Sequence, residues 1–594
     1  MRSELRAWRG EAAVSDRGAD VTPTCAPTLP GLRCVLWRRL PSAAARPSAS
    51  VNEPNLPQAP RVLALKAPGA RAPVRMPVDD VRKQRAESQA FPYARSMHLD
   101  RPSCYRALLS RDPRFDGHFF TAVKSTGIYC RPICPARTPK LENIMFLPSA
   151  AAAQACGFRP CLRCRPELSP ELSTWGDSAH RLSRAVDLLC DGALDDHTVE
   201  QLARRVGVSG RQLRRLFRQH LGAPPKAVAQ ARRVHFAKQL ITDTAMPMTE
   251  VALAAGFGSL RRFNDTLRAI YGTPPSRLRR ATVAAPDSGV TLELPFKPPY
   301  DWDSILKFLE QRAIPRIEAV RDGCYMRSIA VQGAHGWILV RRAPDANALH
   351  ATLRFAPVTA WPSIVQRLRR LFDLGADPVL IDRHLGADEH LAKWVEQRPG
   401  LRVPGAWDPF ELATRAILGQ QVTVAAARAL AARLATACGT RIPVSGELAF
   451  AELDLVFPSA QQVAGVQDLA SVLGMPRARA TSLHRLACVA QGGSHWFDGG
   501  SGSAGSIGRL RELPGFGDWT AQYFAMRALH DPDAFPATDV GLQRASAVAG
   551  MRPTASELLA RAGAWRPWRA YAALHLWASE SAARRSRQAC ESIE

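Results

Sequence analysis

Four cysteines in the first third of the sequence have the spacing of metal ligands. Cys130 and Cys134 form one close pair, and Cys161 and Cys164 form a second pair after a short loop-rich stretch. Two such pairs are typical of a tetrahedral zinc site, in which four thiolates converge on one ion with Zn–S bonds of about 2.3 Å. We therefore predict one zinc ion at these residues. From the spacing alone, a purely structural role is the first interpretation.

A second group of residues that could take part in chemistry lies near the C-terminus, in the motif LPGFGDWTA at residues 513–521. The motif predicts a helix that ends at the leucine, a tight hairpin, and a new helix that begins at the tryptophan. Backbone amides of the hairpin glycines and of the next helix can bind a DNA phosphate, so Gly515, Gly517 and Thr520 are candidate DNA contacts. Asp539 follows the tryptophan by twenty residues. An aspartate after a loop more often caps a helix than takes part in catalysis, and both interpretations stay open here.

The rest of the chain must supply the framework that positions these residues. Residues 1–96 are rich in arginine, alanine and proline, and we expect them to be disordered because they cannot bury enough apolar surface. Met97 is an alternative translation start. We predict a multidomain chain with four further segments: a small zinc-bound α/β module at 97–168, an all-α tandem helix-turn-helix domain at 178–282, an α+β lobe at 290–360, and an all-α helix-hairpin-helix domain at 361–585.

Two helix-turn-helix patterns occur in tandem, at residues 198–219 and 249–271. Each has a glycine in the turn and a serine that opens the second helix. Two such units at this spacing resemble the AraC-type DNA-binding domain. The resemblance implies that each second helix enters the major groove with its N-terminal side chains at base edges. The candidate contacts are Arg211, Gln212, Arg215, Arg261, Arg262 and Asn264.

The overall composition favours an anionic partner. The chain has 79 lysines and arginines against 53 aspartates and glutamates, a formal net charge of +26. Such a charge favours nucleic acid, although a basic tail would give the same number. The sequence contains no uninterrupted apolar run of about 18 residues, so we expect no membrane association. An odd number of cysteines without a clear secretory signal favours the cytoplasm, on the nucleoid when the chain binds DNA.

The cysteine-rich segment resembles the N-terminal domain of the Ada family. The resemblance rests on FFTAVKSTGIYCRPICPARTPKLENIMF and on GFRPCLRC. It implies that Cys130 is both a zinc ligand and the acceptor of a methyl group from a methylphosphotriester. Zinc keeps sulfur deprotonated at neutral pH, so the zinc would activate the nucleophile as well as hold the fold. Arg137 and Arg159 are candidate contacts to phosphate.

Residues from about 292 to 580 resemble the AlkA family of alkyl-base DNA glycosylases. The resemblance rests on PPYDWDSILKFL, WDPFELATRAILGQQVTVAAAR, LPGFGDWTAQYFAMRAL and WRPWRAYAALHLW. It implies that Asp539 is the catalytic carboxylate of a monofunctional enzyme, because a tryptophan stands where strand-cutting relatives have a lysine. The resemblance also implies a base pocket that depends on Phe308, Trp519, Tyr523, Trp577 and Gln421. Gln421 departs from the leucine of the family, and Ala578 departs from a tyrosine.

Together these patterns predict a bifunctional response to DNA alkylation. One half would excise alkylated bases of the 3-methyladenine type from double-stranded DNA. The other half would sense methylphosphotriesters, bind promoter DNA and recruit RNA polymerase. We expect no iron–sulfur cluster, since only Cys590 follows the hairpin motif. The alternative is a methylation-responsive transcription regulator whose glycosylase lobe is inactive or only binds damage.

Overall fold

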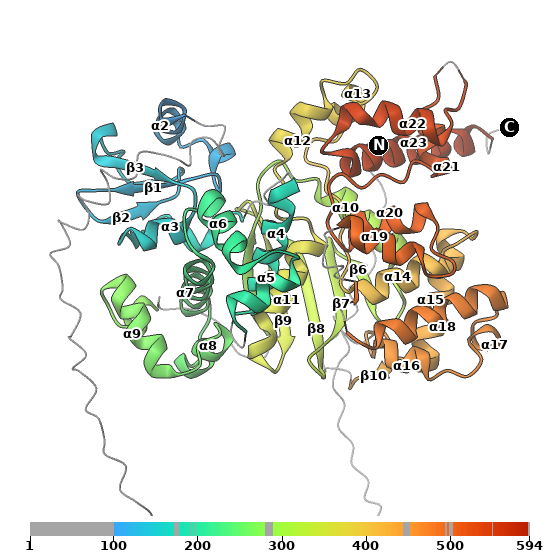
Figure 1. The fold of residues 1–594 in the computed structure, drawn as a ribbon, viewed down its shortest axis with the longest axis horizontal. Coiled ribbons are helices and arrows are strands. Elements are labelled where there is room, and N and C mark those ends of the chain that lie inside the picture. Colours follow the sequence, from blue (N-terminus) through green and yellow to red (C-terminus); the bar gives the residue numbers. More distant parts are fainter. Residues whose placement is uncertain are drawn as a thin grey trace, which may run out of the picture. The chain divides into compact units, whose positions relative to one another are not determined.

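In the computed structural model, the described residues are 100–171, 177–190, 192–194, 197–279, 289–443, 452–493, 496–497, 503–548 and 550–591. The extension predicted at residues 1–96 lies outside them. Within these ranges the predicted fold class is confirmed: a small α/β module is followed by a helical region, a β-sheet lobe and a second, longer helical region (Figure 1). None of the described helices is both long enough and apolar enough to cross a membrane.

The α/β module is built on a four-stranded sheet with the order β3-β1-β2-β4. Strands β1 and β2 pair antiparallel with Thr121 opposite Cys130, so the first cysteine lies at the end of a strand. Strand β4 pairs parallel with β2 and leads directly into the second cysteine pair. The elements of the module are α2 (Arg101–Ser110), β1 (Phe120–Val123), β2 (Ile128–Cys130), β3 (Ile144–Leu147), α3 (Ala150–Ala155) and β4 (Arg159–Pro160).

The helical region that follows contains the two predicted helix-turn-helix units. Ser209 and Ser259 accept hydrogen bonds from the third backbone amide of α6 and α9, as expected of N-caps. Gly207 and Gly256 adopt φ values of 71° and 75° in the turns, a region that glycine enters without steric cost. The helices are α4 (Asp177–Cys190), α5 (Val199–Arg205), α6 (Gly210–Leu221), α7 (Pro225–Asp243), α8 (Met248–Ala254) and α9 (Leu260–Tyr271).

The β-sheet lobe is an antiparallel sheet with the order β5-β9-β8-β7-β6. The first strand of this lobe, β5, pairs with its last strand, β9. The segment between them, which includes α10 and β6, therefore belongs to the same lobe. The elements are β5 (Val290–Pro295), α10 (Trp302–Arg312), β6 (Glu318–Arg321), β7 (Cys324–Val331), β8 (Ala334–Arg342), β9 (Ala348–Phe355) and α11 (Trp361–Leu371).

The longer helical region carries the hairpin motif between α19 and α20. Two short strands, β10 and β11, also pair within this region. Its elements are α12 (Pro378–Leu385), α13 (Ala392–Gln397), α14 (Pro409–Leu418), α15 (Val424–Cys438), β10 (Thr440–Arg441), β11 (Leu455–Val456), α16 (Ala460–Ala464), α17 (Leu469–Leu473), α18 (Arg477–Ala490), α19 (Ser503–Arg511), α20 (Asp518–Arg527), α21 (Val540–Ala545), α22 (Ala555–Arg561) and α23 (Arg569–Glu591).

A buried network of charges joins the sheet lobe to this helical region. Arg327 on β7 and Arg415 on α14 each form ion pairs with both Glu318 and Glu411. Burial opposes ionisation of these carboxylates, yet the two guanidinium groups hold the pKa of Glu318 at about 2. Because loss of one partner would leave an uncompensated buried charge, the network fixes how α14 meets the sheet.

Candidate metal centre and candidate active site

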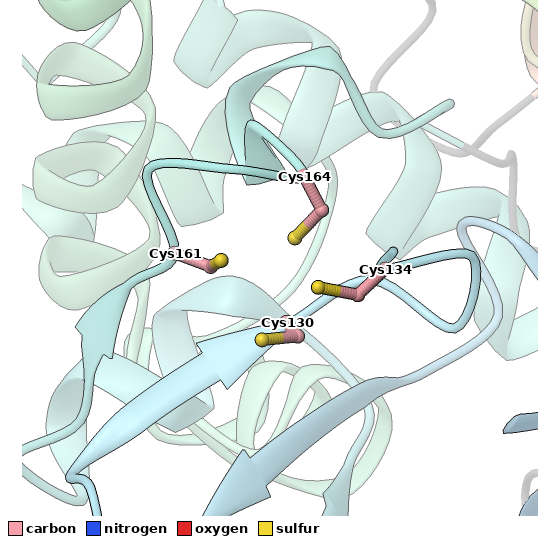
Figure 2. Close-up of side chains that lie close together, drawn as sticks. All are labelled: Cys130, Cys134, Cys161 and Cys164. Carbon is pink, nitrogen blue, oxygen red and sulfur yellow. The ribbon is translucent and has the colours of Figure 1, made fainter. Parts of the chain in front are cut away.

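The four predicted zinc ligands come together in the α/β module. Figure 2 shows the four side chains close together. Their sulfur atoms all lie within 4.8 Å of one another, and all four side chains are buried. A tetrahedral site with Zn–S bonds of about 2.3 Å needs sulfur atoms about 3.8 Å apart. Four converging thiols with this spacing fit a zinc ion with little movement.

The arginines near the cysteines differ in their surroundings. Arg137 and Arg159, the candidate phosphate contacts, are both exposed, and so is Arg163. Arg131 instead forms an ion pair with the buried Asp116 and donates to the carbonyl oxygen of Cys164 at 3.2 Å. Arg131 therefore holds the second cysteine loop in place, whereas the three exposed arginines are available to a ligand.

Removing the zinc is expected to unfold this module. Structural zinc supplies on the order of 10 kcal/mol to the folding of small metal-binding domains, because the binding site exists only in the folded state. We expect a strong chelator to release zinc and to make residues 100–171 sensitive to a protease, with the longer helical region still resistant. Metal analysis and mapping of the cleavage sites test this. Zinc release without new cleavage in the module would contradict it.

The residues predicted to read DNA lie on the outer faces of α6 and α9. Arg211, Gln212 and Arg215 are exposed on α6, while Leu213 and Phe217 on the same helix are fully buried. On α9, Arg261 and Arg262 are exposed and Asn264 is half-buried. The amphipathic pattern thus separates the helix face that packs from the face that can meet a groove. Which of these six residues contact bases stays a prediction.

A cavity of about 670 Å³ brings together most of the predicted base-pocket residues. Phe308 comes from α10, Trp519 and Tyr523 from α20, and Trp577 from α23, and Asp539 lies just before α21. Gln421 is not among the lining residues. It is exposed in the turn between α14 and α15, with φ at 57°. The neighbouring Val422 lines the cavity instead.

Asp539 is both the N-cap of a helix and the central acceptor of the cavity. Its Oδ1 accepts from the backbone amide of Leu542 at 2.8 Å, so the capping interpretation is correct. Its Oδ1 also accepts from Trp577 Nε1 at 2.9 Å, and its Oδ2 accepts from Trp519 Nε1 at 2.8 Å. The cap hydrogen bond and the cavity contacts therefore use the same carboxylate. Capping the helix does not exclude a catalytic role for Asp539.

Two arginines that sequence reasoning missed cover aromatic rings of the cavity. The Arg312 guanidinium lies 3.8 Å from the centre of the Phe308 ring, and that of Arg527 lies 4.7 Å from the same centre. Arg527 Nη1 also donates to the Tyr523 hydroxyl at 2.6 Å. Although burial raises the pKa of Tyr523, these guanidinium groups hold it below its usual value. Because Arg312 and Arg527 each follow their aromatic partner by four residues on a helix, spacing could have revealed them.

The hairpin motif forms a tight turn between α19 and α20. Gly515 has φ at 88°, and a Cβ atom there would come 2.7 Å from Ser482 Oγ on α18. Gly517 is the N-cap of α20, and glycine has no side chain with which to cap the helix. The Thr520 side chain is buried and bonds to Gln420 at 3.4 Å. A DNA contact at Thr520 would therefore use its backbone amide, which lies in the first helical turn.

Replacing Gly515 by alanine is expected to weaken binding to undamaged duplex DNA about tenfold. The left-handed conformation costs a non-glycine residue about 1–2 kcal/mol, and the new Cβ would push against Ser482. Gly508→Ala in α19 is the matched control, because a Cβ there meets no atom within 4 Å. Fluorescence anisotropy with a labelled duplex measures both. Equal affinities for the two variants would argue against a phosphate site at this hairpin.

Comparison with known protein families agrees with this geometry. The family of metal binding domains of Ada matches residues 103–167, and a helix-turn-helix domain family matches residues 202–281. The AlkA N-terminal domain family matches residues 291–408. The HhH-GPD superfamily of base excision DNA repair proteins matches residues 414–570. The chain is thus a multidomain DNA repair protein with a DNA glycosylase domain in its C-terminal half.

Curated relatives match all or part of the chain. A Mycobacterium tuberculosis protein named probable bifunctional transcriptional activator/DNA repair enzyme AlkA is 41% identical over 81% of this chain and 97% of its own length. Escherichia coli DNA-3-methyladenine glycosylase 2 is 37% identical over 48% of this chain and 96% of its own length. Bacillus subtilis AdaA is 32% identical over 30% of this chain and 81% of its own length. The chain belongs to the family of bifunctional transcriptional activator/DNA repair enzymes.

Proposed function

We propose that the C-terminal half removes alkylated bases of the 3-methyladenine type from duplex DNA by hydrolysis, without cutting the strand. The observation that carries this proposal is the position of Asp539, with both carboxylate oxygens held at an aromatic cavity. The name of the Escherichia coli relative supports the choice of base.

The residues of the cavity account for the steps of such a reaction. The target base must leave the duplex, which costs least for damaged pairs. An alkylated purine is cationic and therefore already a good leaving group, so the protein needs no strong general acid. The Asp539 carboxylate can stabilise the positive charge that develops on the sugar and can orient the attacking water. An aromatic face that the chain leaves open to the cavity can favour a cationic base by about 0.5–2 kcal/mol.

Free base released from methylated duplex DNA is the direct test of this activity. The full-length protein is incubated with the DNA, the released bases are separated by chromatography, and the strands are run on a denaturing gel. We expect 3-methyladenine in solution and strands that break only after alkali treatment. Strand breaks without alkali would contradict the monofunctional assignment. No release at all would favour the alternative, a regulator whose glycosylase lobe only binds damage.

For the N-terminal modules, we propose that Cys130 accepts a methyl group from a methylphosphotriester in DNA. The Cys130 sulfur attacks the methyl carbon, the carbon–oxygen bond breaks, and the phosphate oxygen keeps the electron pair. The products are a thioether at Cys130 and an ordinary phosphodiester. Bound by the four cysteines, zinc supplies the chemistry that keeps the sulfur deprotonated at neutral pH.

Methylation of Cys130 would turn the chain into a stronger DNA binder. Transfer removes one negative charge from a surface that faces polyanionic DNA, so affinity should rise. The helices α6 and α9 would then hold promoter DNA, and the bound chain would recruit RNA polymerase. Promoter affinity is measured before and after incubation with methylated DNA at one salt concentration. Equal affinities, with the methyl group on Cys130 confirmed by mass spectrometry, would exclude the switch.

A further inference from the structure

The two tryptophans predicted as pocket walls are the hydrogen-bond donors of the candidate catalytic carboxylate. Trp519 Nε1 donates to Asp539 Oδ2 and Trp577 Nε1 donates to Oδ1, at 2.8 and 2.9 Å. The donors come from different helices, α20 and α23, while the acceptor precedes α21. With the amide of Leu542, the carboxylate is held by three donors. Such an arrangement fixes both the plane of the carboxylate and its distance from the cavity.

Packing against Tyr523 holds the Trp519 ring in place. Its ring stacks on that of Tyr523 with centres 5.0 Å apart and an angle of 9° between the planes. The Tyr523 hydroxyl is bound by Arg527, which also donates to the carbonyl oxygens of Pro404 and Gly405. One face of Trp519 is thus covered by the chain itself. Its indole N–H is aimed at Asp539 by packing that is independent of any bound base.

Gly541 leaves the space in which Trp577 and Asp539 meet at close range. A Cβ atom at Gly541 would lie 2.9 Å from Asp539 Oδ1 and 3.5 Å from Trp577 Cδ1. The φ angle of Gly541 lies outside the left-handed region, so glycine is needed there for space. Any larger residue at position 541 would displace the carboxylate or the indole.

We propose that Trp519 and Trp577 are positioning residues that act on base release through Asp539. Hydrogen bonds from both indoles prevent rotation of the carboxylate, so it faces the cavity without reorganisation. This inference rests on the proposed glycosylase function. A positioning residue differs from a residue that forms a wall of the pocket. A wall residue that stacks on the base contributes to binding, whereas a positioning residue contributes to the rate of the chemical step.

Phenylalanine variants of the full-length chain separate the two roles, because phenylalanine keeps a ring and removes the donor. Two quantities are measured: the single-turnover rate of base release, and the affinity for duplex DNA that carries the base on a 2′-fluoro sugar, whose glycosidic bond resists hydrolysis. For Trp519→Phe and for Trp577→Phe we expect the rate to fall about 10- to 100-fold, the loss typical of a hydrogen bond to a charged group. Affinity should change less than about threefold. The double variant should lose more rate than either single variant.

Trp565→Phe is the matched control. Trp565 Nε1 donates to Asp388 Oδ2 at 2.8 Å, so it is also an indole bonded to a carboxylate, but neither residue lines the cavity. We expect its single-turnover rate to match that of the wild type. Gly541→Ala is a second probe that keeps both indoles and presses on the carboxylate. Gly541→Ala should lower the rate of base release and leave the affinity unchanged. It replaces the phenylalanine variants in this test if one of them does not fold.

The outcomes distinguish this inference from the proposed function. If the wild type releases base and the phenylalanine and Gly541→Ala variants are equally fast, the positioning role is wrong and the glycosylase function stands. If rate and affinity fall in parallel, the tryptophans act as walls and the inference is overturned. If the wild type releases no base, the proposed function fails and this inference fails with it.

Discussion

Replacing Asp539 by asparagine is expected to lower the single-turnover rate of base release by about a hundred- to a thousandfold. The substitution removes the negative charge that stabilises the developing cation on the sugar, and loss of one such preorganised group typically costs about 10²–10³ in rate. Asparagine also has only one acceptor oxygen, so one of the two indole N–H groups loses its partner. Damaged DNA should still bind, because the aromatic rings and the hairpin are unchanged.

The fold should survive this substitution. Asparagine is as good an N-cap as aspartate, so α21 keeps the hydrogen bond from Leu542. Asp388→Asn is the matched control, since Asp388 also accepts from two backbone amides and from one indole, away from the cavity. We expect the control to release base at the rate of the wild type. If Asp539→Asn is equally fast, Asp539 is only a helix cap and another residue stabilises the sugar.

Replacing Cys130 by serine is expected to abolish methyl acceptance completely. Serine is not ionised at neutral pH and is a poor zinc ligand, so it loses both the nucleophile and one of four metal bonds. The measurement is transfer of a radioactive methyl group from methylphosphotriester DNA to the protein. The affinity for promoter DNA after exposure to that DNA should stay at its basal value.

Loss of zinc must be separated from loss of the nucleophile. All four cysteines are buried to a similar extent, with exposures between 6% and 9%, so accessibility does not single out the acceptor. Cys134→Ser loses an equivalent metal bond and is the matched control. Comparing the two variants under conditions where both retain zinc isolates the acceptor, and peptide mapping of the methylated wild type identifies it directly. A methyl group on another cysteine would contradict the assignment of Cys130.

Local sequence patterns predicted the elements of this protein well, because the forces that form them are local. Serines at helix starts and glycines in turns predicted both helix-turn-helix units, and the structure has Ser209, Ser259, Gly207 and Gly256 in those positions. The paired cysteines converge because β2 and β4 lie side by side in one sheet. The hairpin motif predicted a turn that requires glycine at position 515.

Contacts between distant segments could not be predicted in the same way. The covering of Phe308 by Arg527, the exposure of Gln421 and the burial of the Thr520 side chain depend on how helices pack. The motif resemblance placed Trp519 and Trp577 at the pocket and could not tell what their N–H groups bind. A side chain of a given type has the same local propensity whether it meets a base, a guanidinium or a carboxylate.

The sequence by itself indicated the order of the segments and the two cysteine pairs. Those features follow from spacing, capping and hydrophobic periodicity, which act over a few residues. The residues of the base pocket were implied only by the resemblance to the AlkA family. Only the tertiary structure decided that one carboxylate, Asp539, is at once a helix cap and the acceptor of two indoles from α20 and α23. That arrangement depends on angles between helices set by the packing of the whole core, where shape complementarity across distant segments selects one geometry.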